Sequence, residues 1–160
     1  MKKSSHAFAG ATEIRRSLDG ASFGAAPQRA DARRLAQAAH VDLRALGMPH
    51  VNLLLIGAED VTQSFLETLL MDLQEPITHW CAGEPLVLPP PERTSTLILH
   101  DVGALPMADQ RRLLRWLEQA VGKVQVISTT SAALMTRVES GTFVDTLYYR
   151  LNTICLDITV

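Results

Sequence analysis

The sequence of 160 residues contains few cysteines and carries little net charge. Its two cysteines, Cys81 and Cys155, form no CxxC pair, and we interpret them as small core residues of a reduced protein rather than as a disulfide. A net charge of −2 gives no overall field that would attract nucleic acid or an anionic membrane. We therefore expect no direct DNA binding.

Long apolar segments are also missing. A membrane-spanning helix needs about 20 apolar residues, and no run in the sequence approaches that length. Lys2 and Lys3 form a basic pair near the start, but no apolar region follows them, so this end does not have the pattern of a secretory signal. We expect a cytoplasmic protein without a membrane segment.

The distribution of apolar residues divides the chain into three parts. Residues 1–27 are rich in Gly, Ala and Ser and lack periodicity, which is typical of a flexible arm. Residues 28–50 contain a predicted helix that is ended by Gly47 and Pro49, followed by a linker. Residues 51–160 hold the one domain that a chain of this length comfortably allows.

Within that domain, short apolar runs alternate with amphipathic stretches, which predicts strands alternating with helices. The predicted strands are 51–57, 77–81, 96–106 with its turn, 124–128 and 153–160, and the predicted helices are 62–73, 107–121, 131–139 and 143–151. Residues 82–95 contain four prolines and are predicted as a loop or edge segment. The alternation predicts an α/β fold: a three-layer αβα sandwich around a mainly parallel five-stranded sheet.

Ligands of open parallel sheets collect at the carboxyl ends of the strands, and four motifs lie there or soon afterwards. They are TLILHDVGALP (96–106), DQRRLLRWLEQ (109–119), VQVISTTSAAL (124–134) and FVDTLYYRLN (143–152). In this order they resemble TLFLDEIGELP, LQAKLLRVLQ, RIIAATN and FREDLYYRLN of the AAA+ ATPase domain of bacterial sigma-54-dependent transcription activators. The resemblance covers about residues 51–158 and implies the P-loop NTPase fold.

The phosphate loop of that family, GESGTGKE, corresponds here to GAEDVTQS at 57–64. Gly57 is kept, but the later glycines correspond to Asp60 and Thr62, and the phosphate-binding lysine corresponds to Gln63. Such a loop holds phosphates through glycine backbone N–H groups and the lysine charge. The resemblance therefore implies that this segment does not bind ATP.

Other positions depart from the family pattern in the same direction. The Asp–Glu pair that supports magnesium and activates water corresponds to His100 and Asp101; histidine is a poor magnesium ligand, and the shorter Asp misplaces a base. Ser131 corresponds to a sensor Asn, and Val144 to the first of two subunit-boundary arginines, of which Arg150 keeps the second. We expect a relative without ATPase activity that binds neither ATP nor magnesium.

The family grips the sigma factor with a loop bearing GAFTGA, inserted before the DEIG strand. Only residues 74–95 occupy that interval, and they contain no such motif, so we expect no sigma-54 contact of this kind. The sequence ends at Val160, before the helical lid and the DNA-binding helix-turn-helix of the family. By resemblance, we expect both to be missing and the chain not to act alone.

With ATPase activity and sigma-54 contact not expected, the resemblance still allows binding to a partner protein. Arg150 is the candidate at the former subunit boundary, and Arg111, Arg115 and Trp116 are candidates on the helix predicted at 107–121. A solvated face is the default interpretation of the arginines, and packing is an alternative for the tryptophan. We expect a regulatory module in transcriptional or signalling control that docks on an intact AAA+ activator or on a second copy of itself.

Two other functions remain open at this point. Acidic residues at 59, 60 and 101, followed by Thr129 or Thr130, resemble the phosphoacceptor pocket of a two-component receiver domain with Asp101 as the acceptor, although no lysine follows Lys123. The other alternative is a weak nucleotide binder with residual ATPase activity, in which Gln63 takes the place of the lysine.

The predicted domain contains two histidines and two cysteines, which are residue types that bind zinc. His79, Cys81, His100 and Cys155 are the available ligands, but their spacing matches no known zinc pattern. We expect no metal site.

Overall fold

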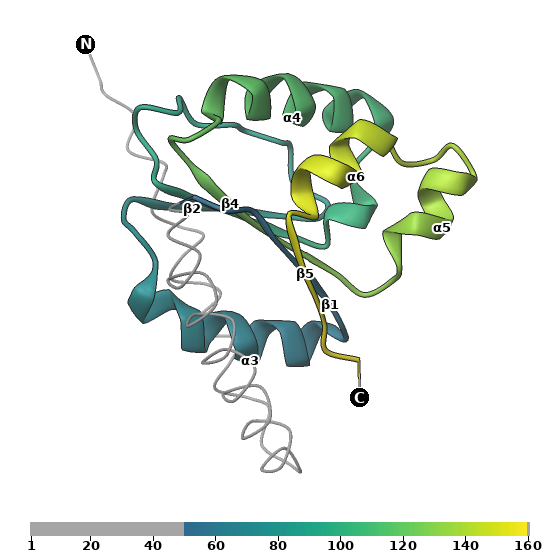
Figure 1. The fold of residues 1–160 in the computed structure, drawn as a ribbon, viewed down its shortest axis with the longest axis horizontal. Helices are drawn as coiled ribbons and strands as arrows, with labels where there is room; N and C mark the ends of the chain where they lie inside the picture. Colours follow the sequence, from purple (N-terminus) through teal and green to yellow (C-terminus); the bar gives the residue numbers. More distant parts are fainter. Residues whose placement is uncertain (1–49, 160) are drawn as a thin grey trace.

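The computed structural model describes residues 50–159, which form one parallel sheet between two layers of helices (Figure 1). The elements in chain order are β1 (Leu53–Ile56), α3 (Glu59–Leu69), η1 (Leu70–Asp72), β2 (Ile77–Cys81), β3 (Thr96–His100), η2 (Val102–Ala104), α4 (Met107–Ala120), β4 (Gln125–Thr130), α5 (Leu134–Glu139), α6 (Asp145–Leu151) and β5 (Ile154–Asp157). The predicted arm at 1–27 and most of the predicted 28–50 segment, including its helix, lie outside the described residues.

The strands lie in the order β2-β3-β4-β1-β5, and every neighbouring pair is parallel. Helix α3 covers one face of the sheet, whereas α4, α5 and α6 lie on the other side (Figure 1). The predicted three-layer αβα fold with a five-stranded parallel sheet is confirmed. Among the described helices, none is long and apolar enough to cross a membrane.

Strand order also decides one question that the sequence left open. A receiver domain has the doubly wound order 2-1-3-4-5. Here β4 separates β3 from β1, with Leu53 in register with Ile127 and Ile98 in register with the same residue from the other side. The receiver interpretation, with Asp101 as phosphoacceptor, is therefore wrong.

Each face of the sheet has its own apolar core because the central strands are buried on both sides. Toward α4 and α6 the core contains Leu54, Leu97, Leu99, Val126, Leu113, Leu117, Leu147 and Leu151. Toward α3 it contains Leu53, Leu55, Ile98, Ile127, Phe65, Leu66 and Leu69. The short apolar runs that predicted the strands thus supply both cores at once.

Three positions differ from the sequence-based expectation. Cys155, predicted as a core residue, is exposed on β5, and Cys81 is only partly buried. Val121, the predicted last residue of the helix at 107–121, lies beyond the helix end. Helix α4 ends at Ala120, and Val121 follows with an extended ψ of 126°. The chain turns there, so the Val121 side chain is 64% exposed, and Val124 is buried instead.

Gln110 joins the start of α4 to the segment that leads into α6. Its side-chain amide donates to the carbonyl oxygens of Leu105 (2.9 Å) and Thr142 (3.1 Å), and its Oε1 accepts from the N–H of Val144 (2.8 Å). Gln110 is 1% exposed, so these three backbone groups, rather than water, satisfy its amide.

Replacing this amide with an apolar side chain of similar length will destabilise the domain. We expect Gln110→Met to lower the free energy of unfolding by about 2–4 kcal/mol, because it leaves buried backbone groups without partners. Urea unfolding measures the change. Gln119→Met, on the exposed side of the same helix, is the control and should change stability by less than about 0.5 kcal/mol.

Candidate functional site

The carboxyl ends of β1, β3 and β4 open into one cleft with a volume of about 790 Å³. All seven residues that the family comparison placed at the nucleotide site line it: Gly57, Asp60, Thr62, Gln63, His100, Asp101 and Ser131. Glu59, Cys81, Ala82, Thr129 and Thr130 complete the lining. Cys81 and Ala82 were not predicted here. Their position follows from the pairing of β2 with β3, which sets Cys81 beside His100.

The connection from β1 to α3 is very short, since only Gly57 and Ala58 separate the strand from the helix. The N–H of Gly57 donates to the carbonyl of Thr130 (3.0 Å), and the N–H of Thr62 donates to the carbonyl of Ala58 (2.9 Å). A Cβ at position 57 would lie 2.9 Å from Cγ1 of Ile158, which explains the need for glycine there. The segment corresponding to a phosphate loop is therefore a strand end followed directly by helix.

The predicted helix start at about Thr62 was three residues too late. Helix α3 begins at Glu59, and its first turn contains both Glu59 and Asp60. Acidic residues are favourable in a first turn because they face the free N–H groups and the positive end of the helix dipole. The acidic pair is a local signal that could have located the start, whereas the amphipathic pattern used for the prediction does not define the first turn.

The charge of the cleft is one-sided. Three carboxyl side chains, those of Glu59, Asp60 and Asp101, line it, and none of the lining residues within 50–159 is a Lys or Arg. The N-terminus of α3, which in other proteins attracts anions, already has two acidic side chains of its own. This arrangement opposes the binding of a polyphosphate.

Asp101 and the hydroxyl residues come from the ends of β3 and β4. Asp101 adopts a left-handed backbone conformation (φ 52°, ψ 59°), which Asp tolerates better than most residues, and its N–H donates to Oγ1 of Thr129 (3.1 Å). Oγ1 of Thr130 donates to the carbonyl of Ala132 (2.9 Å). Ser131 is exposed at the mouth of the cleft. The two threonines are thus engaged in holding the loops after β3 and β4.

His100 ends β3 beside His79 of β2, and Nδ1 of His79 lies 3.3 Å from Nε2 of His100. Burial lowers the pKa of His100 to about 4, with a further contribution from His79, and burial also lowers the pKa of His79. Both rings are therefore neutral at pH 7. This pairing was not predicted, because it depends on the register between two strands.

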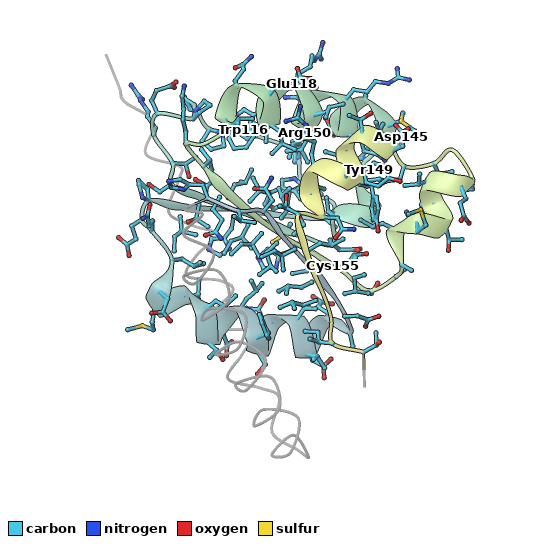
Figure 2. All side chains as sticks on the ribbon, in the orientation of Figure 1. Trp116, Glu118, Asp145, Tyr149, Arg150 and Cys155 are labelled. Atoms are coloured by element: carbon cyan, nitrogen blue, oxygen red, sulfur yellow. The ribbon has the colours of Figure 1, made fainter. Side chains whose placement is uncertain are left out.

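The proposed zinc ligands are not brought together. His79, Cys81 and His100 lie on β2 and β3, whereas Cys155 lies on β5 at the opposite edge of the sheet (Figure 2). Residues 50–159 contain no group of three or more His, Cys, Asp or Glu side chains that could hold a metal ion.

The candidate partner contacts lie on α4 and α6, and none of them lines the cleft. Figure 2 shows Trp116 and Arg150 in the layer that these helices form. Arg111, Arg115 and Arg150 are exposed. Trp116 is only 8% exposed, and its indole N–H donates to the carbonyl of Pro89 (2.6 Å). It packs beneath the proline-rich segment, which corrects its assignment as a contact residue. Val144 is half-buried against the same core.

The family is settled by the extent of its match. Residues 32–160 match the family described as Sigma-54 interaction domain. The chain belongs to this family. The assignment confirms the resemblance carried by the motifs at the ends of β3 and β4 and in α6.

Curated relatives match over a shorter stretch. The sigma54-dependent transcriptional regulator SfnR of Pseudomonas fluorescens is 36% identical over 75 residues, which is 40% of this chain and 20% of that protein. The DNA-binding transcriptional regulator NtrC of Rhizobium meliloti is 38% identical over 72 residues, which is 38% of this chain and 15% of that protein. The matched stretch is thus a fifth or less of the length of these relatives.

Solved structures agree on the fold. NtrX from Brucella abortus in complex with ATP gives a TM-score of 0.58 at 17% identity, covering 94% of this chain and 42% of that one. The P-loop NTPase domain of the sigma-54 transport activator from E. coli gives 0.51 at 14% identity, covering 78% and 94%. The chain therefore has the P-loop NTPase fold, which at these identities carries no information about activity.

The histidine pair makes stability depend on pH. Because the folded-state pKa of His100 is about 4 and its ordinary value is 6.5, the unfolded chain binds more protons between these values, and stability falls as pH is lowered through this range. We expect His100→Gln to lose about 1 kcal/mol less than the wild type between pH 7 and pH 5, allowing for partial exposure. Urea midpoints at both pH values measure this. His50→Gln should behave like the wild type, and equal losses in all three proteins would contradict the assignment.

Proposed function

We propose that this chain is a non-catalytic regulatory module of the sigma-54 interaction family, which binds no ATP and acts by docking on a partner protein. The observation that carries the proposal is the junction of β1 with α3. Helix α3 begins two residues after the strand, and its first turn carries Glu59 and Asp60.

A phosphate loop works because several N–H groups of a wide turn point at the phosphates before the helix begins. In this chain there is no room for such a turn between Ile56 and Glu59, and the N–H of Thr62 is already engaged by the carbonyl of Ala58. Gln63 lines the cleft without a charge. A cleft of this volume could hold a small molecule, so the obstacle to a nucleotide is charge and backbone geometry rather than size.

The residues at the end of β3 do not fit a magnesium ion either. His100 is neutral and is hydrogen-bonded to His79 through the ring nitrogen that faces it. Magnesium requires oxygen ligands in octahedral arrangement, and Asp101 is the one carboxylate that follows this strand directly. We therefore assign no ATP-dependent step to this protein.

Docking is proposed for the layer formed by α4 and α6, where Arg111, Arg115 and Arg150 are exposed. The guanidinium groups offer several donors each, and exposed arginines are frequent in protein interfaces. The partner would be an intact AAA+ activator or a second copy of this chain. We propose a role in transcriptional or signalling control, in the cytoplasm, which the description of the curated relatives as transcriptional regulators supports.

Contact with sigma-54 through a projecting loop is not part of the proposal. Residues 82–95 connect β2 to β3 and lie against α4, where Trp116 donates to the carbonyl of Pro89 and Arg112 to the carbonyl of Leu86 (3.3 Å). Leu86 is buried. This segment is fastened to the domain and carries no GAFTGA motif.

The absence of nucleotide binding is tested by thermal unfolding with ATP and magnesium. A ligand present at 100 times its Kd stabilises a protein by about 2.7 kcal/mol, which is a shift of several degrees for a domain of this size. We expect 1 mM ATP with magnesium, which is about 100 times a Kd of about 10 µM, to leave Tm unchanged within about 1 °C. A rise of several degrees would support the alternative, a weak nucleotide binder.

Docking is tested by sedimentation velocity of the chain alone and mixed with an intact activator of the family. We expect a larger species in at least one of these samples, and we expect Arg150→Ala to weaken it about tenfold or more, since removing an interface arginine often costs over 1 kcal/mol. Arg93→Ala, which removes an exposed arginine before β3, is the matched control. Equal behaviour of the two variants would show that the interface lies elsewhere.

A further inference from the structure

The two imidazole rings at the edge of the cleft meet in an unusual arrangement. Their centroids are 5.6 Å apart and their planes differ by 13°, while the facing nitrogens are 3.3 Å apart. The centroid distance exceeds the nitrogen–nitrogen distance by the sum of the two centroid-to-nitrogen distances within the rings. Both nitrogens therefore lie on the line that joins the centroids. With nearly parallel planes, the rings are coplanar and meet edge to edge rather than face to face.

This geometry aims the in-plane orbitals of Nδ1 of His79 and Nε2 of His100 directly at each other. A neutral imidazole has one N–H and one lone pair, so a single proton lies between the rings, donated by one and accepted by the other. Burial keeps both rings neutral at pH 7 by lowering their pKa values. Replacing the one shared proton by a cation would leave two lone pairs on one straight line.

We propose that His79 and His100 form a linear two-coordinate site for a monovalent d¹⁰ metal ion, the cuprous ion, which replaces the proton between Nδ1 and Nε2. Imidazole nitrogen is a suitable donor for copper. The ion binds by accepting one lone pair from each facing nitrogen. The ring that donated the shared proton loses it there and takes up one proton from solvent at its other nitrogen, so both imidazoles stay neutral and no net proton is released. No electron is transferred in this step.

The distance requires a modest adjustment. Metal–nitrogen bonds of about 2 Å on a straight line separate the nitrogens by about 4 Å, so the rings must move apart by about 0.7 Å. His79 can provide this movement because it is exposed on β2, an edge strand. Zinc is disfavoured, since it takes four tetrahedral ligands and no third His, Cys, Asp or Glu converges here among residues 50–159.

The test uses silver, a redox-inert d¹⁰ ion, and cuprous ion under a reductant. Thiols bind both ions, so the full chain carries Cys81→Ser and Cys155→Ser; neither cysteine is fully buried. With ¹⁵N-labelled histidine, we expect one equivalent of either ion to shift the facing nitrogens of both rings. His79→Gln and His100→Gln should each weaken binding at least tenfold, whereas His50→Gln should not change it.

Three results would overturn the site: ring signals that do not move with one equivalent of silver, binding that persists in His79→Gln, or zinc binding as tight as that of silver. Because His79 is exposed, His79→Gln leaves the core intact, and its Tm checks this directly. If the serine background itself unfolds, the same titration of the wild type, with its thiols alkylated in the folded state, gives the same readout.

Discussion

The junction of β1 with α3 is the constraint on which the rest of this domain depends. Gly57 is fixed from two sides, by its N–H bond to the Thr130 carbonyl and by the close approach of Ile158. Only two residues connect the strand to the helix. Helix α3 packs on the sheet, where Phe65 is fully buried. The same compact turn removes the ring of N–H groups that a phosphate would need.

Different residues determine the fold of this domain and the chemistry of its cleft. The apolar cores on the two faces of the sheet stabilise the strand order β2-β3-β4-β1-β5. The cleft at the strand ends follows from that order, whether or not a ligand binds there. The chemistry of the cleft depends on a few side chains that the cores do not constrain. Among the described residues they are Glu59, Asp60 and Asp101, and that part of the chain adds no Lys or Arg to the lining.

Sequence reasoning located the strands because apolar runs such as 53–56 and 96–100 are buried on both faces and have little alternative. The residues of the cleft came from the family resemblance, and all seven lie together. The sequence did not predict features that depend on contacts between distant segments of the chain. The bond between His79 and His100 depends on strand register, and the burial of Trp116 depends on a proline-rich segment folding back over α4. The start of α3 was predicted three residues too late because the amphipathic pattern does not define a first turn, in which the acidic Glu59 and Asp60 lie.

We propose that this cleft does not bind nucleotide although the chain has the fold of a P-loop NTPase. Equilibrium dialysis of the folded chain against labelled ATP with magnesium measures this most directly, because it counts bound nucleotide without relying on stability or turnover. We expect no saturable binding up to 1 mM ATP. Any binding free energy would then be weaker than about −4.1 kcal/mol, the value for a Kd of 1 mM. Saturation near one ATP per chain at micromolar concentration would contradict it.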